Sequence, residues 1–485
     1  MGIVINQSFK NTVSTYIGFG IGAINTLFLY TNFMSDTYYG LIAFVLSAAN
    51  IMMPVMAFGV HNAIIKYYST FKTKNSLNSF LTLMLFLPLV AIIPTALIGY
   101  MGYDTIGQLL SKQNPIVNDY VWHIFIVAVA MAYFEIFFAW SKTQMQTVFG
   151  NFLKEVSHRV GVMLLLFALN FEWITIDQFI IGVVVVYILR MLFMKLYAYY
   201  IRLPVLKFQR VEHLSAILRY SGLIIIAGSV ATLMLDIDKF MIGQILEIEK
   251  VAYYSVAIFI ATVIAVPQRA MQQIMMPLTA KFLNENNTNA LKDLYHKSSL
   301  NLLIISGLIF LGIVLNINQL YEVLPEEFRG GLFVVVIVSL AKLYDNVLGN
   351  NNAILFNSNY YRMVLYFGVL LVVLAITLNI ILIPIYGIDG SALATFLAVF
   401  VYNTIKVLFV KQKFNMQPFS KASLKVALLI IGFVLLFYFW EFQFHPIINI
   451  ILKSTLITGV YVFLIYRLDI SEDISKLIRK YLRLK

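Results

Sequence analysis

Long apolar stretches recur along the whole chain and are separated by short polar segments. A membrane-spanning helix needs about 20 consecutive, mostly apolar residues. About fourteen stretches approach this length, at residues 12–33, 39–60, 80–101, 120–140, 158–170, 178–200, 217–242, 251–275, 299–316, 331–352, 363–385, 391–410, 424–440 and 448–466. The fifth is short, and the seventh and tenth are polar. The pattern therefore predicts an all-α polytopic membrane protein with twelve to fourteen transmembrane helices, and about fourteen is the preferred number.

Composition supports this class and excludes others. Of 485 residues, 61% are hydrophobic and 12% are charged, whereas a soluble domain is about half apolar and about a quarter charged. The chain has no cysteine, and its six histidines form no metal-binding spacing. We therefore expect no metal site and no thiol chemistry. No loop is longer than about 25 residues, so we expect no soluble catalytic domain.

The loops alternate in charge. One set is rich in lysine and arginine, as around Lys72, Arg210 and Lys292, and the other is acidic, as around Glu172 and Glu327. Lysine and arginine accumulate in cytoplasmic loops of membrane proteins, which explains the net charge of +12 without any nucleic acid. The alternation predicts that the basic loops and both chain termini are cytoplasmic.

A weak internal repeat appears when the sequence is shifted by about half its length. Residues 38–40 (Tyr-Tyr-Gly) then meet residues 253–255 (Tyr-Tyr-Ser), and Lys66 meets Lys281. Parallel halves related by an axis along the membrane normal are a known transporter design. We expect two six-helix halves around a central cavity, two additional C-terminal spans, and a short tail, with boundaries at 1–210, 211–415, 416–470 and 471–485.

The tail has the pattern of a basic amphipathic helix. Ser471 is placed to cap it, and Leu477, Ile478, Tyr481 and Leu482 fall on one face, with lysines and arginines largely on the other. Such a helix binds the surface of a membrane without crossing it. We expect it on the inner leaflet; docking on a partner protein is the alternative.

Ionisable residues inside apolar spans mark candidate functional positions. They are costly in hydrocarbon and usually face a polar cavity or pair with another helix. The densest group lies in residues 219–281, and further members lie in the fourth, sixth and tenth spans. The candidates are Asp236, Asp238, Lys239, Arg269, Glu135, Arg190, Lys342 and Asp345, and Pro267, two residues before Arg269, can break the helix there. For each charge, lining a cavity and locking two helices together remain the two interpretations; for Lys342 and Asp345 the lock would be a mutual salt bridge.

Residues 382–395 (LIPIYGIDGSALAT) form a turn signature between two apolar runs. Pro384 is placed to end one span, and Gly387 and Gly390 permit a tight turn. Small residues up to Thr395 then give the next span a face for close packing.

This turn resembles that of the polysaccharide flippases of the multidrug/oligosaccharidyl-lipid/polysaccharide exporter superfamily. Residues 238–243 with 249–257, and residues 36–41 with 58–60 and 65–68, resemble two further patterns of that family. Residues 171–175 depart from it because they lack the equivalent glycine turn. The resemblance covers residues 1–466. It implies transport, not catalysis, of polyprenyl-pyrophosphate-linked oligosaccharides across a bacterial inner membrane for polysaccharide, O-antigen or capsule synthesis.

On this resemblance, Arg269 is the first candidate for the pyrophosphate, because guanidinium binds phosphate oxygens bidentately. Lys239, Arg190 and Lys342 are further candidates in the cavity. Asp236, Asp238, Asp345 and Glu135 are candidates for charge pairing or for coupling to a proton or sodium gradient, with no other cofactor expected. Membrane lipids and other polysaccharide-assembly proteins are the expected partners. A multidrug exporter of the same superfamily is the first alternative, and a membrane glycan polymerase or glycosyltransferase is the second.

Overall fold

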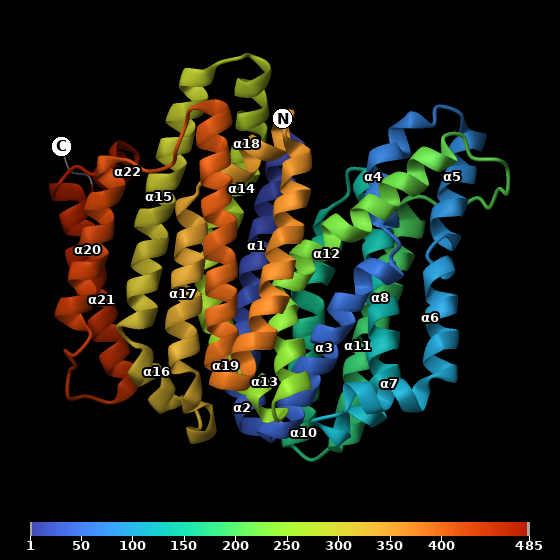
Figure 1. The fold of residues 1–485 in the computed structure, drawn as a ribbon, viewed down its shortest axis with the longest axis horizontal. Helices are drawn as coiled ribbons and strands as arrows, with labels where there is room; N and C mark the ends of the chain where they lie inside the picture. The colour runs from blue at the N-terminus through green and yellow to red at the C-terminus, as the bar shows by residue number, and fades with distance from the viewer. Residues whose placement is uncertain (1, 483–485) are drawn as a thin grey trace. The chain divides into compact units, whose positions relative to one another are not determined.

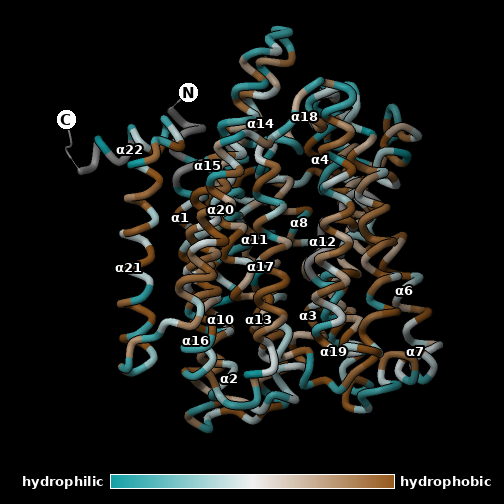
Figure 2. Tube along the Cα trace, turned by 60° about the vertical axis from the view of Figure 1, so that its left-hand side comes forward, coloured by the Kyte–Doolittle hydropathy of each residue, from teal (hydrophilic) through white to brown (hydrophobic). Residues whose placement is uncertain are grey.

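The computed structural model describes the backbone of residues 2–482; side chains are described except those of 1–6, 8, 9, 226–229, 231–235, 273, 477, 478 and 480–485. Within that part the chain forms helices and no strand. It divides into two compact units, residues 1–255 and 256–485 (Figure 1). Apolar residues dominate the middle of the helices and polar residues gather toward their ends (Figure 2).

Among the described residues, the first unit contains twelve α-helices and the beginning of a thirteenth. They are α1 (Gly2–Ile24), α2 (Tyr30–Phe33), α3 (Asp36–Met56), α4 (Val60–Tyr67), α5 (Lys74–Phe86), α6 (Leu89–Met101), α7 (Tyr103–Leu110), α8 (Val121–Thr143), α9 (Val148–Phe152), α10 (His158–Asn170), α11 (Ile176–Ile201) and α12 (Leu214–Ile245). Helix α13 (Glu249–Thr262) crosses the boundary between the units. Helix α8 is central, because it packs against α3, α4 and α11.

The second unit contains the remaining helices. They are α14 (Val266–Asn284), α15 (Thr288–Val314), α16 (Ile317–Val323), α17 (Leu332–Val347), α18 (Asn351–Asn357), α19 (Tyr361–Phe414), α20 (Lys421–Phe437), α21 (Pro446–Arg467) and α22 (Glu472–Leu482). Helix α15 packs against α14, α17, α20 and α21. The last two long helices, α20 and α21, lie beside it in Figure 1.

The predicted number of spans is confirmed. Ten helical segments of the described chain are long and apolar enough to cross a membrane, and one of them, α19, contains two predicted spans. Three more predicted spans lie on α10, α12 and α20. Local caps start several of these helices as their sequences suggest: Thr175 accepts a hydrogen bond from the Gln178 N–H, and Ser420 accepts one from the Ser423 N–H.

The turn between the two spans of α19 is the one that the glycines predict. Gly387 has φ 61° and ψ −137°, outside the helical region and open only to glycine at low cost. A Cβ on Gly390 would lie 2.1 Å from the Leu382 carbonyl oxygen, so the two arms approach too closely for any side chain there. The Ser391 hydroxyl donates to Asn379 Oδ1 at 2.7 Å and joins the arms. Pro384 lies within the first arm, three residues before the break, and Thr395 is buried in the second.

Helix α12 packs against α3 within the first unit. The predicted second half begins at residue 211 and therefore includes α12. Packing and sequence repetition are different properties, so the compact units and the repeated halves need not end at the same residue.

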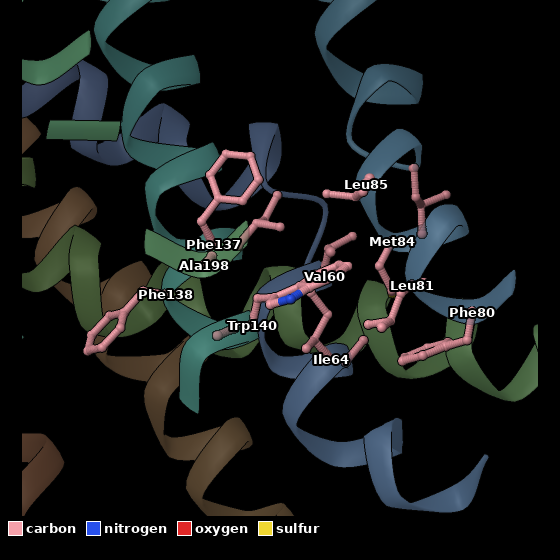
Figure 3. Close-up of a cluster of buried hydrophobic side chains, with 14 of the residues drawn as sticks. Val60, Ile64, Phe80, Leu81, Met84, Leu85, Phe137, Phe138, Trp140 and Ala198 are labelled. Atoms are coloured by element: carbon pink, nitrogen blue, oxygen red, sulfur yellow. The ribbon is translucent and has the colours of Figure 1, made fainter. Parts of the chain in front are cut away.

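An aromatic and aliphatic cluster fixes the centre of the first unit (Figure 3). It joins Val60 and Ile64 of α4 to Phe80 of α5 and to Trp140 of α8, all at most 1% exposed. The Trp140 indole N–H donates to the Arg202 carbonyl at 3.2 Å, so its one polar atom is satisfied. This packing positions α8, which carries Glu135.

The tail forms a helix, as its pattern predicts. Ser471 Oγ accepts the N–H of Ile474 at 3.4 Å and donates to Asn301 Oδ1 of α15 at 2.7 Å. Asn301 in turn donates to Asp473 at 3.0 Å, which fixes the start of α22 on α15. The apolar side chains predicted at 477, 478, 481 and 482 lie outside the described residues.

Candidate functional site

The two acids of α12 are buried and engaged within the first unit. Asp236 accepts a hydrogen bond from Ser47 of α3 at 3.1 Å, and the Lys239 ammonium lies 3.5 Å from the same oxygen. Asp238 accepts from the Tyr254 hydroxyl at 2.6 Å. The charge of Lys239 is therefore largely balanced by Asp236, one helical turn away.

Arg190 and Glu135 lie on neighbouring helices but do not form an ion pair in the described structure. Glu135 pairs with Lys154 at 2.6 Å. Arg190 is only 9% exposed, and its guanidinium stacks over the rings of Phe134 and Tyr187 at 4.2 and 5.1 Å. Its Nε has no hydrogen-bond acceptor among the described residues. Cation–π contact is thus its main stabilisation.

In the second unit Asp345 is the centre of a polar cluster. It accepts hydrogen bonds from Asn403 at 3.1 Å and from Gln268 at 3.4 Å. Lys342 is half-buried on the same helix, three residues before Asp345. The structure therefore shows Asp345 hydrogen-bonded to neutral amides of two other helices, α14 and α19.

Asn403 and Lys406 extend this cluster, and the sequence analysis did not select them. Lys406 is 1% exposed, donates to Asn352 at 2.9 Å and lies over the Tyr402 ring at 4.2 Å. The two residues are three apart in an apolar span, so they share one helix face. That spacing was the available signal.

The α-helix is interrupted just before Pro267, between α13 and α14. Pro267 lies in the first turn of α14, where a missing backbone N–H has no cost. The break frees the Ile264 carbonyl, and Asn346 of α17 donates to it at 2.6 Å. Asn350 and Asn351 are also buried and donate to Thr279 and to Tyr295. These three asparagines join helices within the unit, so they contribute rigidity at the point where α14 begins.

Arg269 differs from the other cations. It is exposed on α14, and no ion pair or hydrogen bond engages its side chain in the described structure. One turn farther along the same helix, Gln272 lines a cavity of about 180 Å³. An arginine without a described partner therefore stands in the sequence between two residues that line this cavity, Gln268 and Gln272, in a segment that is apolar enough to cross a membrane.

A second, larger cavity in this unit is apolar. It measures about 750 Å³ and lies between α15, α17, the second arm of α19, and α20. Its lining includes Phe310, Leu340, Phe400, Ile431 and Leu435 and contains no charged residue.

The described residues contain no group of three or more His, Asp or Glu placed to hold a metal ion.

The fold is that of a known superfamily of membrane transporters. The structure of the lipid II flippase MurJ in an inward closed conformation matches it with a TM-score of 0.72 at 14% identity, over 96% of this chain and 100% of that one. An inward-facing multidrug resistance MATE transporter of the MOP superfamily matches with a TM-score of 0.58 at 14% identity, over 86% and 95%. The Vibrio cholerae MATE transporter VcmN matches with a TM-score of 0.57 at 13% identity, over 86% and 98%.

Sequence comparison assigns the family. Residues 4–282 match the model of the polysaccharide biosynthesis protein family, and the chain belongs to that family. Comparison with curated protein sequences gave no significant match. The resemblance inferred from the 382–395 turn is thereby confirmed: the chain belongs to the polysaccharide biosynthesis protein family and has the fold of the flippase and transporters named above.

Proposed function

We propose that this protein translocates polyprenyl-pyrophosphate-linked oligosaccharides from the inner to the outer leaflet of a bacterial inner membrane, for O-antigen, capsule or related polysaccharide synthesis. The observation that carries the proposal is Arg269, a cation without a neutralising partner in the described structure, next to a cavity in a membrane-spanning segment. The family match and the MOP fold support the same transport class.

The physical task is to move a charged, hydrated headgroup through a layer of hydrocarbon. Each pyrophosphate oxygen that leaves water must gain a protein donor, and an arginine provides a planar pair of them. Arg269 is free to do this. Lys239 is already balanced by Asp236, and Arg190 is stacked on two rings. We therefore rank Arg269 first, with Arg190, Lys342 and Lys239 as auxiliary cations.

The polyprenyl chain needs an apolar path. The cavity of about 750 Å³ beside α20 offers apolar side chains along its length and no charge that the chain would have to displace. It lies in the same unit as Arg269. We propose that the tail occupies this groove while the headgroup occupies the polar site.

Transport against a gradient needs an energy source. Asp345 accepts hydrogen bonds from the neutral amides of Gln268 and Asn403, so we rank it first for binding a proton or a sodium ion, ahead of Asp236 and Asp238. Glu135 is already paired with Lys154. Alternating access between the two halves of the chain would then expose the site to each side in turn.

The test is headgroup export in cells that lack the chromosomal gene. Arg269→Ala should reduce export, normalised to folded protein, because the charged hydrogen bonds that it removes are worth about 1.5–3 kcal/mol, roughly ten- to a hundredfold in rate. Arg269→Lys should restore only part, since lysine keeps the charge and loses the planar pair. The readout is the leaflet in which complete lipid-linked repeat units accumulate.

Arg329→Ala is the matched control, because Arg329 is exposed and already paired with Glu326 at 3.0 Å. It should export normally. Normal export by Arg269→Ala would remove that residue from the site, and accumulation of single repeat units on the outer leaflet of the deletion strain would indicate a polymerase instead.

The structural similarity to MATE transporters keeps a multidrug exporter as the second candidate. Cationic drugs favour an acidic cavity, whereas the free ionic group beside this cavity is Arg269. Export of a cationic dye by vesicles that contain the wild-type protein, and no defect in lipid-linked intermediates on deletion, would favour the drug exporter.

A further inference from the structure

The cavity of about 180 Å³ in the second unit has an unusual lining. Its polar members are amides and no ionised side chain: Gln268 and Gln272 of α14, Asn350, and Asn352 of α18. Methionines of α14, together with Leu302 and Phe356, supply the apolar wall. An uncharged wall of this kind neither attracts nor neutralises an ion, so the cavity is built for a neutral, hydroxyl-rich ligand.

Hydrogen bonds to residues outside the cavity fix the orientation of two of these amides, Asn352 and Gln268. An ammonium group only donates hydrogen bonds, so Lys406, 2.9 Å from Asn352 Oδ1, holds that oxygen away from the cavity and leaves the Asn352 NH₂ free to donate. Gln268 uses its NH₂ on Asp345, which leaves its carbonyl oxygen as an acceptor. The wall therefore presents a donor and an acceptor in set orientations.

Asn350 has a different role. The Thr279 hydroxyl donates to the Met275 carbonyl at 2.7 Å, so it can only accept from the Asn350 NH₂, 2.6 Å away. Asn350 is 2% exposed and is thus part of the scaffold. Gln272, by contrast, makes no side-chain hydrogen bond in the described structure and is free to bind a ligand through both of its polar atoms.

Size and position narrow the ligand further. A cavity of about 180 Å³ is small for a ligand site, so we match it to one sugar ring rather than to a chain of rings. Gln272 lies three residues from Arg269, one helical turn along the same side of α14. A ring in the cavity would therefore be close to a pyrophosphate held by Arg269.

We propose that this cavity is a sugar subsite that binds an uncharged ring next to the pyrophosphate, with Gln272 and Asn352 as its specificity-determining residues and Lys406 as a positioning residue acting through Asn352. The inference rests on the proposed function. It adds that uronic acids and other charged rings are disfavoured at this position, because the lining offers no counter-charge.

The experiment measures binding to the purified full-length protein by native mass spectrometry. The probes are undecaprenyl pyrophosphate alone, and the same lipid carrying one glucose, galactose, N-acetylglucosamine or galacturonic acid. The wild type should bind at least one neutral-sugar probe about tenfold more tightly than the bare lipid, since two or three hydrogen bonds of about 1 kcal/mol each are added. The galacturonic acid probe should show no such gain.

Three variants test which residues cause the tighter binding of the sugar-bearing lipid. Gln272→Met and Asn352→Asp should each reduce it about three- to tenfold while leaving affinity for the bare lipid unchanged. Asn352→Asp keeps an oxygen toward Lys406, whose ammonium balances the added carboxylate charge, and removes the NH₂ donor. Lys406→Met should reduce the gain as well, because the Asn352 amide can then rotate. A merely structural role for Lys406 would lower the folded fraction and leave the ratio between the two lipids unaltered.

Gln319→Met is the matched control. Gln319 is 2% exposed on α16, does not line the cavity, and neither of its amide atoms has a partner in the described structure. This variant should keep the wild-type ratio between the affinities for the sugar-bearing and the bare lipid. Equal affinity of wild type for bare and sugar-bearing lipids, or an undiminished ratio in Gln272→Met, would overturn the subsite and leave the flippase proposal standing. Failure to bind any pyrophosphate lipid would overturn both.

Discussion

Two buried lysines show how much the surroundings of a single residue matter. Lys406 and Lys453 are each 1% exposed in helices of the second unit. Lys406 Nζ donates to Asn352, whereas Lys453 Nζ has no acceptor among the described residues. The sequence around each residue does not tell which lysine has a hydrogen-bond acceptor, since both are lone lysines in apolar runs. Arg269 was selected because an arginine and a proline stand together in a span, but its freedom from partners became visible only with the neighbouring helices in place.

The difference between the two lysines predicts opposite effects of one substitution. Lys453→Met should raise thermal stability in detergent, by about 1 kcal/mol or more, because it removes a buried group that pays desolvation without a hydrogen bond in return. Lys406→Met should lower stability, since it leaves Asn352 Oδ1 without its donor. Loss of monodisperse protein on heating, followed by size-exclusion fluorescence, measures both. A fall in stability for Lys453→Met would show that its ammonium has a partner in the folded protein.

Among the structural elements, the turn between α12 and α13 depends on a side chain from far away in the sequence. Asn114 Nδ2 donates to the carbonyls of Gly243 and Leu246 at 2.7 and 2.8 Å, and Asn114 Oδ1 accepts the Ile248 N–H at 2.8 Å. All its hydrogen-bonding atoms are used and the residue is 6% exposed. This one asparagine holds the turn closed.

Asn114→Ala should therefore destabilise the turn by about 2–4 kcal/mol, because three hydrogen bonds are lost and backbone groups are left buried without partners. The Ile248 amide should then exchange with deuterium much faster than in the wild type. Asn32→Ala serves as the control: Asn32 is exposed and donates to the Phe28 carbonyl of its own helical segment. Equal exchange at Ile248 in Asn114→Ala and wild type would contradict the assigned role.

The elements that the sequence predicted are those whose causes are local. The Gly387 turn needs a positive φ, and the cap at Ser471 needs a hydroxyl three residues before its partner N–H. Asn114 acts on residues about 130 positions away, so nothing near it in the chain indicates its role. The polar stripe of Asn346, Asn350, Asn351 and Asn352 is visible in the sequence as a candidate cavity wall, whereas the contact of Asn352 with Lys406 joins two helices and is not. Periodicity and hydropathy found the spans; the contacts that shape the site arise from their packing.

For the whole molecule, the charge pattern of the loops predicts an orientation that single-cysteine labelling can check directly, because the native chain has no cysteine. The positions to test are exposed in the structure, so a failure to react would not reflect burial: Lys72, Gln209 and Asn287 for the inside, and Gln108, Glu327 and Gln443 for the outside. Basic loops are retained in the cytoplasm during insertion.

In intact cells, a membrane-impermeant maleimide should label cysteines at 108, 327 and 443 and leave those at 72, 209 and 287 unlabelled until the membrane is permeabilised. In chain order the six positions should lie inside, outside, inside, inside, outside and outside, so the result also tests whether the number of crossings between neighbouring positions is odd or even. Labelling of all six in the reverse pattern would invert the orientation and keep the fold. Agreement in residues 1–255 with reversal in 256–485 would mean that an odd number of crossings has been miscounted near α12, and the proposed parallel arrangement of the two halves would then have to be given up.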